Sequence, residues 1–145
     1  MQDTVRIVLF GGLQIHHEEQ VFSHFPTYRA RALLAFLAFH REQPHPREFL
    51  AEMLWPGGHP DAIRLRLNQT VAEIRKALKP VDTVLRSDRF FLSLNPSVAT
   101  DVADFLDLIR SAKQTTDLTQ KRLLLTRAEA MARMPFLAGH KENTP

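Results

Sequence analysis

The alternation of apolar and polar positions predicts short strands at the start of the chain. Apolar residues recur with a period of two over residues 5–9 and again over 13–15. A glycine pair at 11–12 supplies a turn between these runs, and another apolar pair follows at 21–22. We therefore expect a small antiparallel sheet before the first helix.

The pattern then becomes helical. Thr27 can cap a helix that ends near His40, and Pro46 suits the first turn of a second, shorter helix after the loop 41–46. Both segments place apolar residues at helical spacing. The first stripe is Ala30, Leu33, Leu34, Leu37 and Ala38, and the second is Phe49, Leu50, Met53 and Leu54. Trp55, which ends the second stripe, is expected in the core.

A third helix is expected from about Asp61 to Lys79, with Pro80 as its stop. On a helical wheel its apolar stripe is narrow and consists of Ile63, Leu67, Thr70, Val71, Ile74 and Leu78. The opposite face holds Leu65, Gln69, Ala72 and Lys76, flanked by Arg66, Asn68 and Glu73. Exposing most of these side chains to solvent costs little free energy, and several of them are suited to contacts with base edges.

After this helix the sequence predicts a β-hairpin and then two more helices. Residues 84–94 contain two runs of β-formers around Ser87-Asp88. The helical pattern resumes after the acidic junction 99–104, and a cap at Thr116 or Asp117 separates two segments. Their apolar positions are Val102, Phe105, Leu106 and Ile109, then Leu118, Leu123, Leu124, Leu125, Ala128, Met131 and Ala132.

A sheet, three helices and a hairpin, in that order, are typical of a winged helix-turn-helix, in which the third helix lies in the major groove of DNA. The additional N-terminal sheet suggests the OmpR-type branch. We therefore expect an α+β fold with this winged helix over residues 1–98 and an α-helical hairpin over residues 99–145.

The composition of the chain excludes several other classes of protein. Apolar residues make up 44% of the chain and charged residues 24%, as in a globular protein. The sequence contains no cysteine, which excludes disulfides, thiolate zinc sites and thiol nucleophiles. Neither a membrane span nor a signal peptide is predicted, so we expect a cytoplasmic protein that does not enter a membrane.

The positive charge is concentrated in the middle of the chain. The net charge is +3, and residues 26–79 alone carry nine basic and five acidic side chains. A protein that binds the phosphate backbone of DNA needs basic side chains at the contact surface, and this helical region supplies them.

The sequence also resembles the SARP (antibiotic regulatory protein) family of transcriptional regulators over nearly its whole length. The resemblance is carried by RARALLAFLAFH, REFLAEMLWP, LNQTVAEIRKAL and DVADFLDLIRSA, followed by PFLAG. It implies a winged helix that binds direct repeats near promoters as a homodimer, and then the start of a TPR-like bacterial transcriptional activator domain. The loop at residues 55–60 corresponds to the segment that contacts RNA polymerase in OmpR-type proteins.

Individual residues follow from the resemblance. It matches Arg29 and Arg31 to basic positions at the start of the first helix, and Arg75 and Lys76 to bases late in the recognition helix. Phe90 matches an aromatic residue of the wing. Two positions depart from the family pattern, because Asn68 stands where arginine is frequent and Arg89 where glycine is frequent. The helical domain is also shorter than usual, with about one helix pair.

The predicted function is therefore sequence-specific binding of double-stranded DNA by a transcription regulator. Asn and Gln pair well with adenine, Arg contacts guanine or phosphate, and an exposed leucine can touch a thymine methyl group. The candidate DNA-binding residues are Arg29, Arg31, Arg64, Leu65, Arg66, Asn68, Gln69, Ala72, Arg75, Lys76, Arg86 and Arg89. An alternative is a winged helix that binds a partner protein and no DNA.

No enzyme, metal or cofactor is expected. The seven histidines lack the spacing of a metal site, and Gly11-Gly12 lacks the other residues of a phosphate loop. Glu18-Glu19, Asp101 and Asp104 have no histidine or serine placed to form a relay, so capping and solubility explain them.

Overall fold

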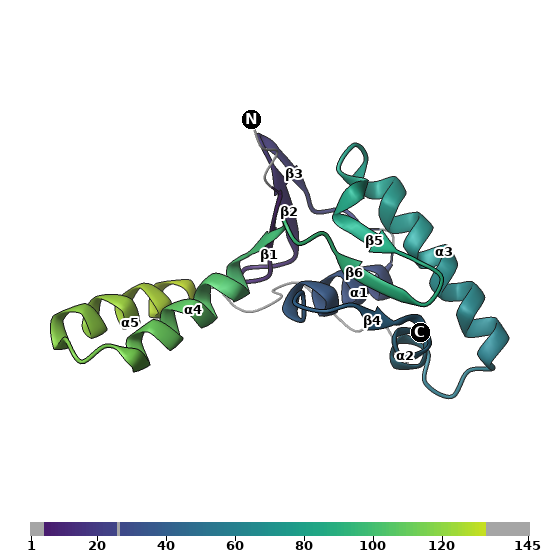
Figure 1. The fold of residues 1–145 in the computed structure, drawn as a ribbon. Helices are drawn as coiled ribbons and strands as arrows, with labels where there is room; N and C mark the ends of the chain where they lie inside the picture. The colour runs from purple at the N-terminus through teal and green to yellow at the C-terminus, as the bar shows by residue number, and fades with distance from the viewer. Residues whose placement is uncertain (1–4, 26, 133–145) are drawn as a thin grey trace.

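The structure is a computed structural model that describes residues 5–25 and 27–132 (Figure 1). In chain order the elements are β1 (Val5–Val8), β2 (Gln14–His17), β3 (Gln20–Phe22), α1 (Tyr28–Phe39), β4 (His45–Pro46), α2 (Arg47–Leu54), α3 (Pro60–Leu78), the 3-10 helix η1 (Asp82–Val84), β5 (Leu85–Ser87), β6 (Phe91–Leu94), β7 (Ala99–Thr100), α4 (Asp101–Gln114) and α5 (Leu118–Ala132). The predicted mixture of helices and small sheets is confirmed.

The N-terminal strands form a sheet with one strand that the sequence did not predict. Its order is β3-β2-β1-β7, with antiparallel pairs except between β1 and β7, which are parallel. Gly11 and Gly12 have positive φ angles of 84° and 113° in the turn between β1 and β2. The missed strand β7 has two residues and pairs across about ninety positions, so no local alternation indicates it.

A second sheet has the order β4-β6-β5 and includes the predicted hairpin. The strands of that hairpin pair in the register Leu85↔Leu94, and its turn lies at residues 88–90 rather than at Ser87-Asp88. The prediction of a plain loop at 41–46 is wrong at its end, because His45 pairs with Leu92. This strand is too short for a sequence pattern and depends on a distant partner.

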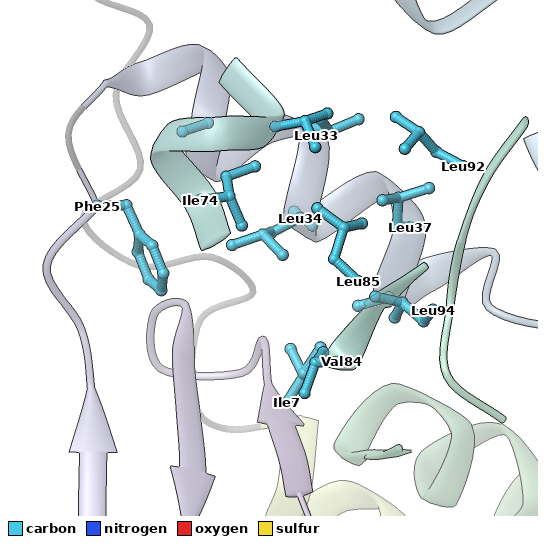
Figure 2. Close-up of a cluster of buried hydrophobic side chains, with 14 of the residues drawn as sticks. Ile7, Phe25, Leu33, Leu34, Leu37, Ile74, Val84, Leu85, Leu92 and Leu94 are labelled. Atoms are coloured by element: carbon cyan, nitrogen blue, oxygen red, sulfur yellow. The ribbon is translucent and has the colours of Figure 1, made fainter. Parts of the chain in front are cut away.

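α1 lies at the centre of the core. Its N-cap is Thr27, whose hydroxyl accepts a hydrogen bond from the backbone N–H of Ala30 at 3.0 Å. Side chains of α1 meet side chains from α3 and both sheets (Figure 2). The labelled residues are Ile7, Phe25, Leu33, Leu34, Leu37, Ile74, Val84, Leu85, Leu92 and Leu94. One continuous core therefore fixes α3 against both sheets.

The core stripe predicted for α3 is confirmed. The buried residues of this helix are Ile63, Leu67, Thr70, Val71, Ile74 and Leu78. The polar member of the stripe, Thr70, is satisfied because its hydroxyl donates to the carbonyl of Arg66 at 2.9 Å. At the end of the helix, Lys79 has the extended ψ of 135° that a following proline favours.

The stripe predicted for α2 is only partly correct. Leu50 and Leu54 are buried as expected, but Phe49 is 52% exposed and Ala51 takes a core position instead. A helix of eight residues makes two turns, so its periodicity does not fix which flank faces inward. Trp55 is half-buried against the core, as predicted.

α4 and α5 lie side by side and extend from the first sheet on the side away from α3 (Figure 1). Asp117 caps α5, because its carboxylate accepts from the N–H groups of Thr119 and Gln120 at 2.9 and 3.3 Å. Within this pair Leu106, Leu118 and Leu123 are exposed. Val102 belongs to the main core, so this core continues into α4. The division into two domains at residue 98 stays a prediction.

Candidate nucleic-acid interface

The face of α3 opposite its core stripe is exposed along the middle of the helix. Leu65 lies on this face and is 58% exposed. The other predicted contact residues of this helix that are exposed are Arg64, Arg66, Asn68, Gln69, Ala72 and Lys76. Eight of the twelve candidates thus lie on this helix, and all of them except the half-buried Arg75 are exposed.

His59 caps the start of α3, because its Nδ1 accepts from the N–H of Asp61 at 3.2 Å. Pro60 occupies the first turn, where its missing N–H costs no hydrogen bond. Asp61 also lies 3.4 Å from the guanidinium of Arg64 in an exposed i,i+3 pair. The early part of the helix is thus set by local contacts, and Arg64 keeps its charge at the surface.

Arg75 joins α3 to the hairpin. Its Nη2 donates to the carbonyl of Leu85 at 3.1 Å and to the hydroxyl of Ser87 at 2.9 Å. Both acceptors lie on β5, and Arg75 is half-buried. These hydrogen bonds give the predicted contact residue a positioning role, because they fix β5 relative to the helix.

The turn of the hairpin is closed by Asp88. Its Oδ1 accepts from the N–H groups of Phe90 and Phe91, each at 2.8 Å, and its own N–H donates to the Phe91 carbonyl at 3.0 Å. Within this turn the guanidinium of Arg89 lies 5.5 Å from the ring centre of Phe90, which is 65% exposed. Arg86 is exposed on β5, so the hairpin presents two cations and one aromatic ring.

Arg47 is a residue of this surface that the sequence analysis missed. Its side chain donates a hydrogen bond to Oδ1 of Asn68 on α3, and its backbone N–H donates to the carbonyl of Phe90 at 2.8 Å. Burial and the neighbouring cation Arg75 lower the pKa of the Arg47 guanidinium, whereas the Asp88 carboxylate raises it. A basic residue directly after Pro46 was the only available signal, and the contact with α3 is not visible in the sequence.

Four cations surround a hollow beside the C-terminal half of α3. The hollow has a volume of about 630 Å³, and its basic lining residues are Arg47, Arg75, Lys76 and Lys79. Asn68 and Ala72 contribute the helix side, Ser87 the hairpin side, and Asp82 the single acidic group. This excess of positive charge suits a phosphate or the acceptor-rich edge of a base.

A larger groove of about 1120 Å³ lies between α2, the first half of α3 and the hairpin turn. Both signs of charge line it, because its lining includes three basic and three acidic residues: Arg47, Arg64, Arg89, Glu48, Glu52 and Asp88. The mixed charge makes this groove a weaker anion site than the smaller hollow.

The two candidates on α1 lie in a different environment. Nε of Arg29 donates to the carbonyl of Leu54 at 3.0 Å, and its guanidinium lies 5.7 Å from the ring centre of Trp55. Arg31 is half-buried, and its Nε is shielded from solvent. Both side chains thus lie near the surface and also pack against other parts of the fold.

Within residues 5–25 and 27–132 no three His, Asp or Glu side chains gather in a way that could hold a metal ion. In the same part of the chain, no helix is both long and apolar enough to cross a membrane.

Comparison with known proteins shows a likeness of fold. No protein-family model matches the chain, and no curated protein is similar to it. The fold is similar to that of Mycobacterium tuberculosis EmbR, solved in complex with a low-affinity phosphopeptide, with a TM-score of 0.69 and 23% sequence identity. The likeness covers 94% of this chain and 38% of the EmbR chain, so this chain spans well under half the length of that protein. At this level of sequence identity the likeness shows a shared fold.

Proposed function

We propose that this protein is a transcription regulator that binds duplex DNA in a sequence-specific way. In this proposal α3 lies in the major groove, and the hairpin of β5 and β6 acts as a wing on the backbone or in the minor groove. The whole protein works in the cytoplasm as a non-enzymatic regulator of the SARP type.

The exposed face of α3 is the observation that carries the proposal. This face combines two amides, several cations and one exposed leucine, directly opposite a fully buried stripe. A helix that lies in a groove needs such a face, because its outward side chains meet base edges while its other side holds it to the fold.

Each candidate residue receives a role from its position. Asn68, Gln69 and Arg66 meet base edges, and Leu65 meets a thymine methyl group. Arg86 and Arg89 contact phosphates from the wing. The methyl group of Ala72 meets a thymine methyl group as Leu65 does. The remaining contacts are assigned to the phosphate backbone beside α3 and α1: Arg29, Arg31, Arg64, Arg75 and Lys76.

The assembly and partners are part of the same proposal. Two copies bind direct repeats near a promoter as a homodimer, and the loop at residues 55–60 contacts RNA polymerase. Residues 1–98 form the DNA-binding domain, and residues 99–145 form the start of a TPR-like activator domain. The exposed leucines of α4 and α5 support this last assignment, because stacked helical repeats cover such faces with the next repeat.

Selection of bound duplexes from a random pool tests the function directly. We expect the 145-residue chain to enrich one motif, and a direct repeat of it if two copies bind together. Recovery of random sequences at the background level would contradict sequence-specific DNA binding.

A second candidate function is protein binding without DNA. The exposures of Leu65 and Phe90, at 58% and 65%, favour it, because apolar side chains at a surface often mark a protein interface. Salt separates the two candidates. For DNA, the logarithm of the binding constant falls with the logarithm of the salt concentration, with a slope of about −0.9 for each phosphate neutralised. The affinity of an apolar protein interface changes much less with salt.

A further inference from the structure

Arg47 and Asn68 form a pair that joins two elements of the proposed DNA-binding surface. Arg47 begins α2 and Asn68 lies on the exposed face of α3, and the guanidinium Nη2 donates to the Asn68 side chain. The backbone N–H of Arg47 is itself held by the Phe90 carbonyl at 2.8 Å. The hairpin turn therefore holds the backbone of Arg47, and the recognition helix holds its guanidinium.

The chemistry of this pair determines which atom of Asn68 remains available. A guanidinium has only N–H donors, so the amide atom that faces it must be the oxygen Oδ1. The amino group Nδ2, with its two N–H donors, is then the part of Asn68 directed to other partners. Arg47 contributes further N–H donors beside it, so the two side chains offer several donors and a single remaining lone pair, on Oδ1 beside the positive charge of Arg47.

This arrangement disfavours the usual reading of adenine by asparagine. That reading needs Oδ1 to accept from the adenine N6 amino group while Nδ2 donates to N7. In this structure Arg47 is already at Oδ1, and its positive charge repels a second donor there. Guanine presents two acceptors in the major groove, N7 and O6, so both can receive N–H groups from the pair.

The surroundings of the pair also favour an acceptor-rich partner. Arg47 and Asn68 line the hollow of about 630 Å³ together with Arg75, Lys76 and Lys79. Burial and Arg75 lower the pKa of the Arg47 guanidinium. The surrounding protein groups therefore stabilise the positive charge of Arg47 only in part. An electron-rich base edge in the hollow would supply the missing compensation.

We propose that Arg47 is a specificity-determining residue that holds Oδ1 of Asn68 and thereby converts this asparagine from an adenine reader into a reader of guanine. This inference rests on the proposed function, since it names the base that one position of the DNA-binding surface selects.

The test compares the base preferences of four proteins in a random-pool selection. Arg47→Met removes the donors while it keeps a long side chain, and Asn68→Ala removes the amide. Arg89→Met is the matched control, because it removes a cation from the same surface without touching Asn68. A thermal unfolding curve for each variant shows that it is folded.

We expect the wild-type motif to contain one guanine whose selection depends on both residues. In Arg47→Met the preference at that position shifts from guanine towards adenine by about fivefold or more, as expected when one base contact is exchanged. In Asn68→Ala that position loses its preference. Arg89→Met binds more weakly and keeps the guanine.

Two results would overturn the inference alone, and a third would overturn the proposed function. If the wild type enriches a motif but Arg47→Met keeps every base preference, DNA reading stands and the role of Arg47 is wrong. If Arg47→Met does not fold, an unchanged motif in Asn68→Ala is equally decisive against the pair. If the wild type enriches nothing, the proposed function itself fails.

Discussion

The side chains on α3 fall into two groups: exposed ones that are available to contact a ligand, and ones that hold the helix to the rest of the fold. Gln69 and Leu65 are exposed and point to a role in contacts with a ligand, whereas Arg75 on the same helix donates both of its hydrogen bonds to the hairpin. The residue type alone does not distinguish these roles, because both groups were candidate DNA contacts in the sequence. Burial and hydrogen-bond partners separate them.

At this scale we predict that Gln69→Ala weakens binding to the selected motif and hardly changes binding to random duplex. The expected loss is about 1–3 kcal/mol, because one base contact disappears. Titration of labelled motif and random duplexes by fluorescence anisotropy measures both affinities.

The matched variant is Arg86→Ala on the wing. It should weaken both duplexes alike and make the salt slope shallower by about 0.9, as for the loss of one phosphate contact. Equal losses on both duplexes for Gln69→Ala would show that its amide does not read bases.

At the scale of elements, the recognition helix and the hairpin form one unit through Arg75. Its hydrogen bonds to Leu85 and Ser87 on β5 supplement the core contacts between these elements. Orientation of the wing relative to α3 determines which phosphates both can reach together. A loss of this connection therefore affects stability and DNA binding at once.

We predict that Arg75→Ala lowers the free energy of unfolding by about 1–2 kcal/mol, since two hydrogen bonds from a charged donor are lost. Lys76→Ala is the control, because the neighbouring side chain is exposed and should change stability by less than about 0.5 kcal/mol. Urea denaturation of both variants gives the values. Equal stabilities would mean that the hydrogen bonds of Arg75 contribute nothing to the fold.

Elements with a long, regular pattern were predictable from the sequence, and short or long-range ones were not. The six buried residues of α3 follow directly from its period of 3.6 over nineteen residues. The two-residue strands β4 and β7 pair with partners far along the chain, so local spacing does not indicate them. The contact between Arg47 and Asn68 was invisible for the same reason, since it joins two helices that the core brings together.

At the scale of the whole molecule, Asp101 joins the C-terminal helices to the first sheet. Its carboxylate accepts from the backbone N–H groups of Leu9 and Phe10 at 2.9 and 3.0 Å, and Asp101 itself is buried. A nearby ion pair of 2.6 Å joins Asp104 to Arg6. The sequence predicted only capping and solubility for these carboxylates, whereas Asp101 connects α4 to the two residues that directly follow β1.

We predict that Asp101→Ala lowers the free energy of unfolding by about 2 kcal/mol or more, because two backbone donors in the junction lose their acceptor. Asp107→Ala removes a carboxylate from an exposed i,i+3 pair with Arg110 and should cost at most about 0.5 kcal/mol. Thermal unfolding followed by circular dichroism compares the two. Similar small losses for both variants would refute the role of Asp101 in the junction.

The central claim is that the exposed face of α3 and the adjoining hairpin bind duplex DNA. Backbone amide chemical shifts, followed by NMR while the recovered duplex is added, test it most directly. We predict shifts concentrated on residues 64–76 and 86–90, with the amides of α4 and α5 unchanged. A duplex that binds while residues 64–76 keep their shifts would contradict the claim.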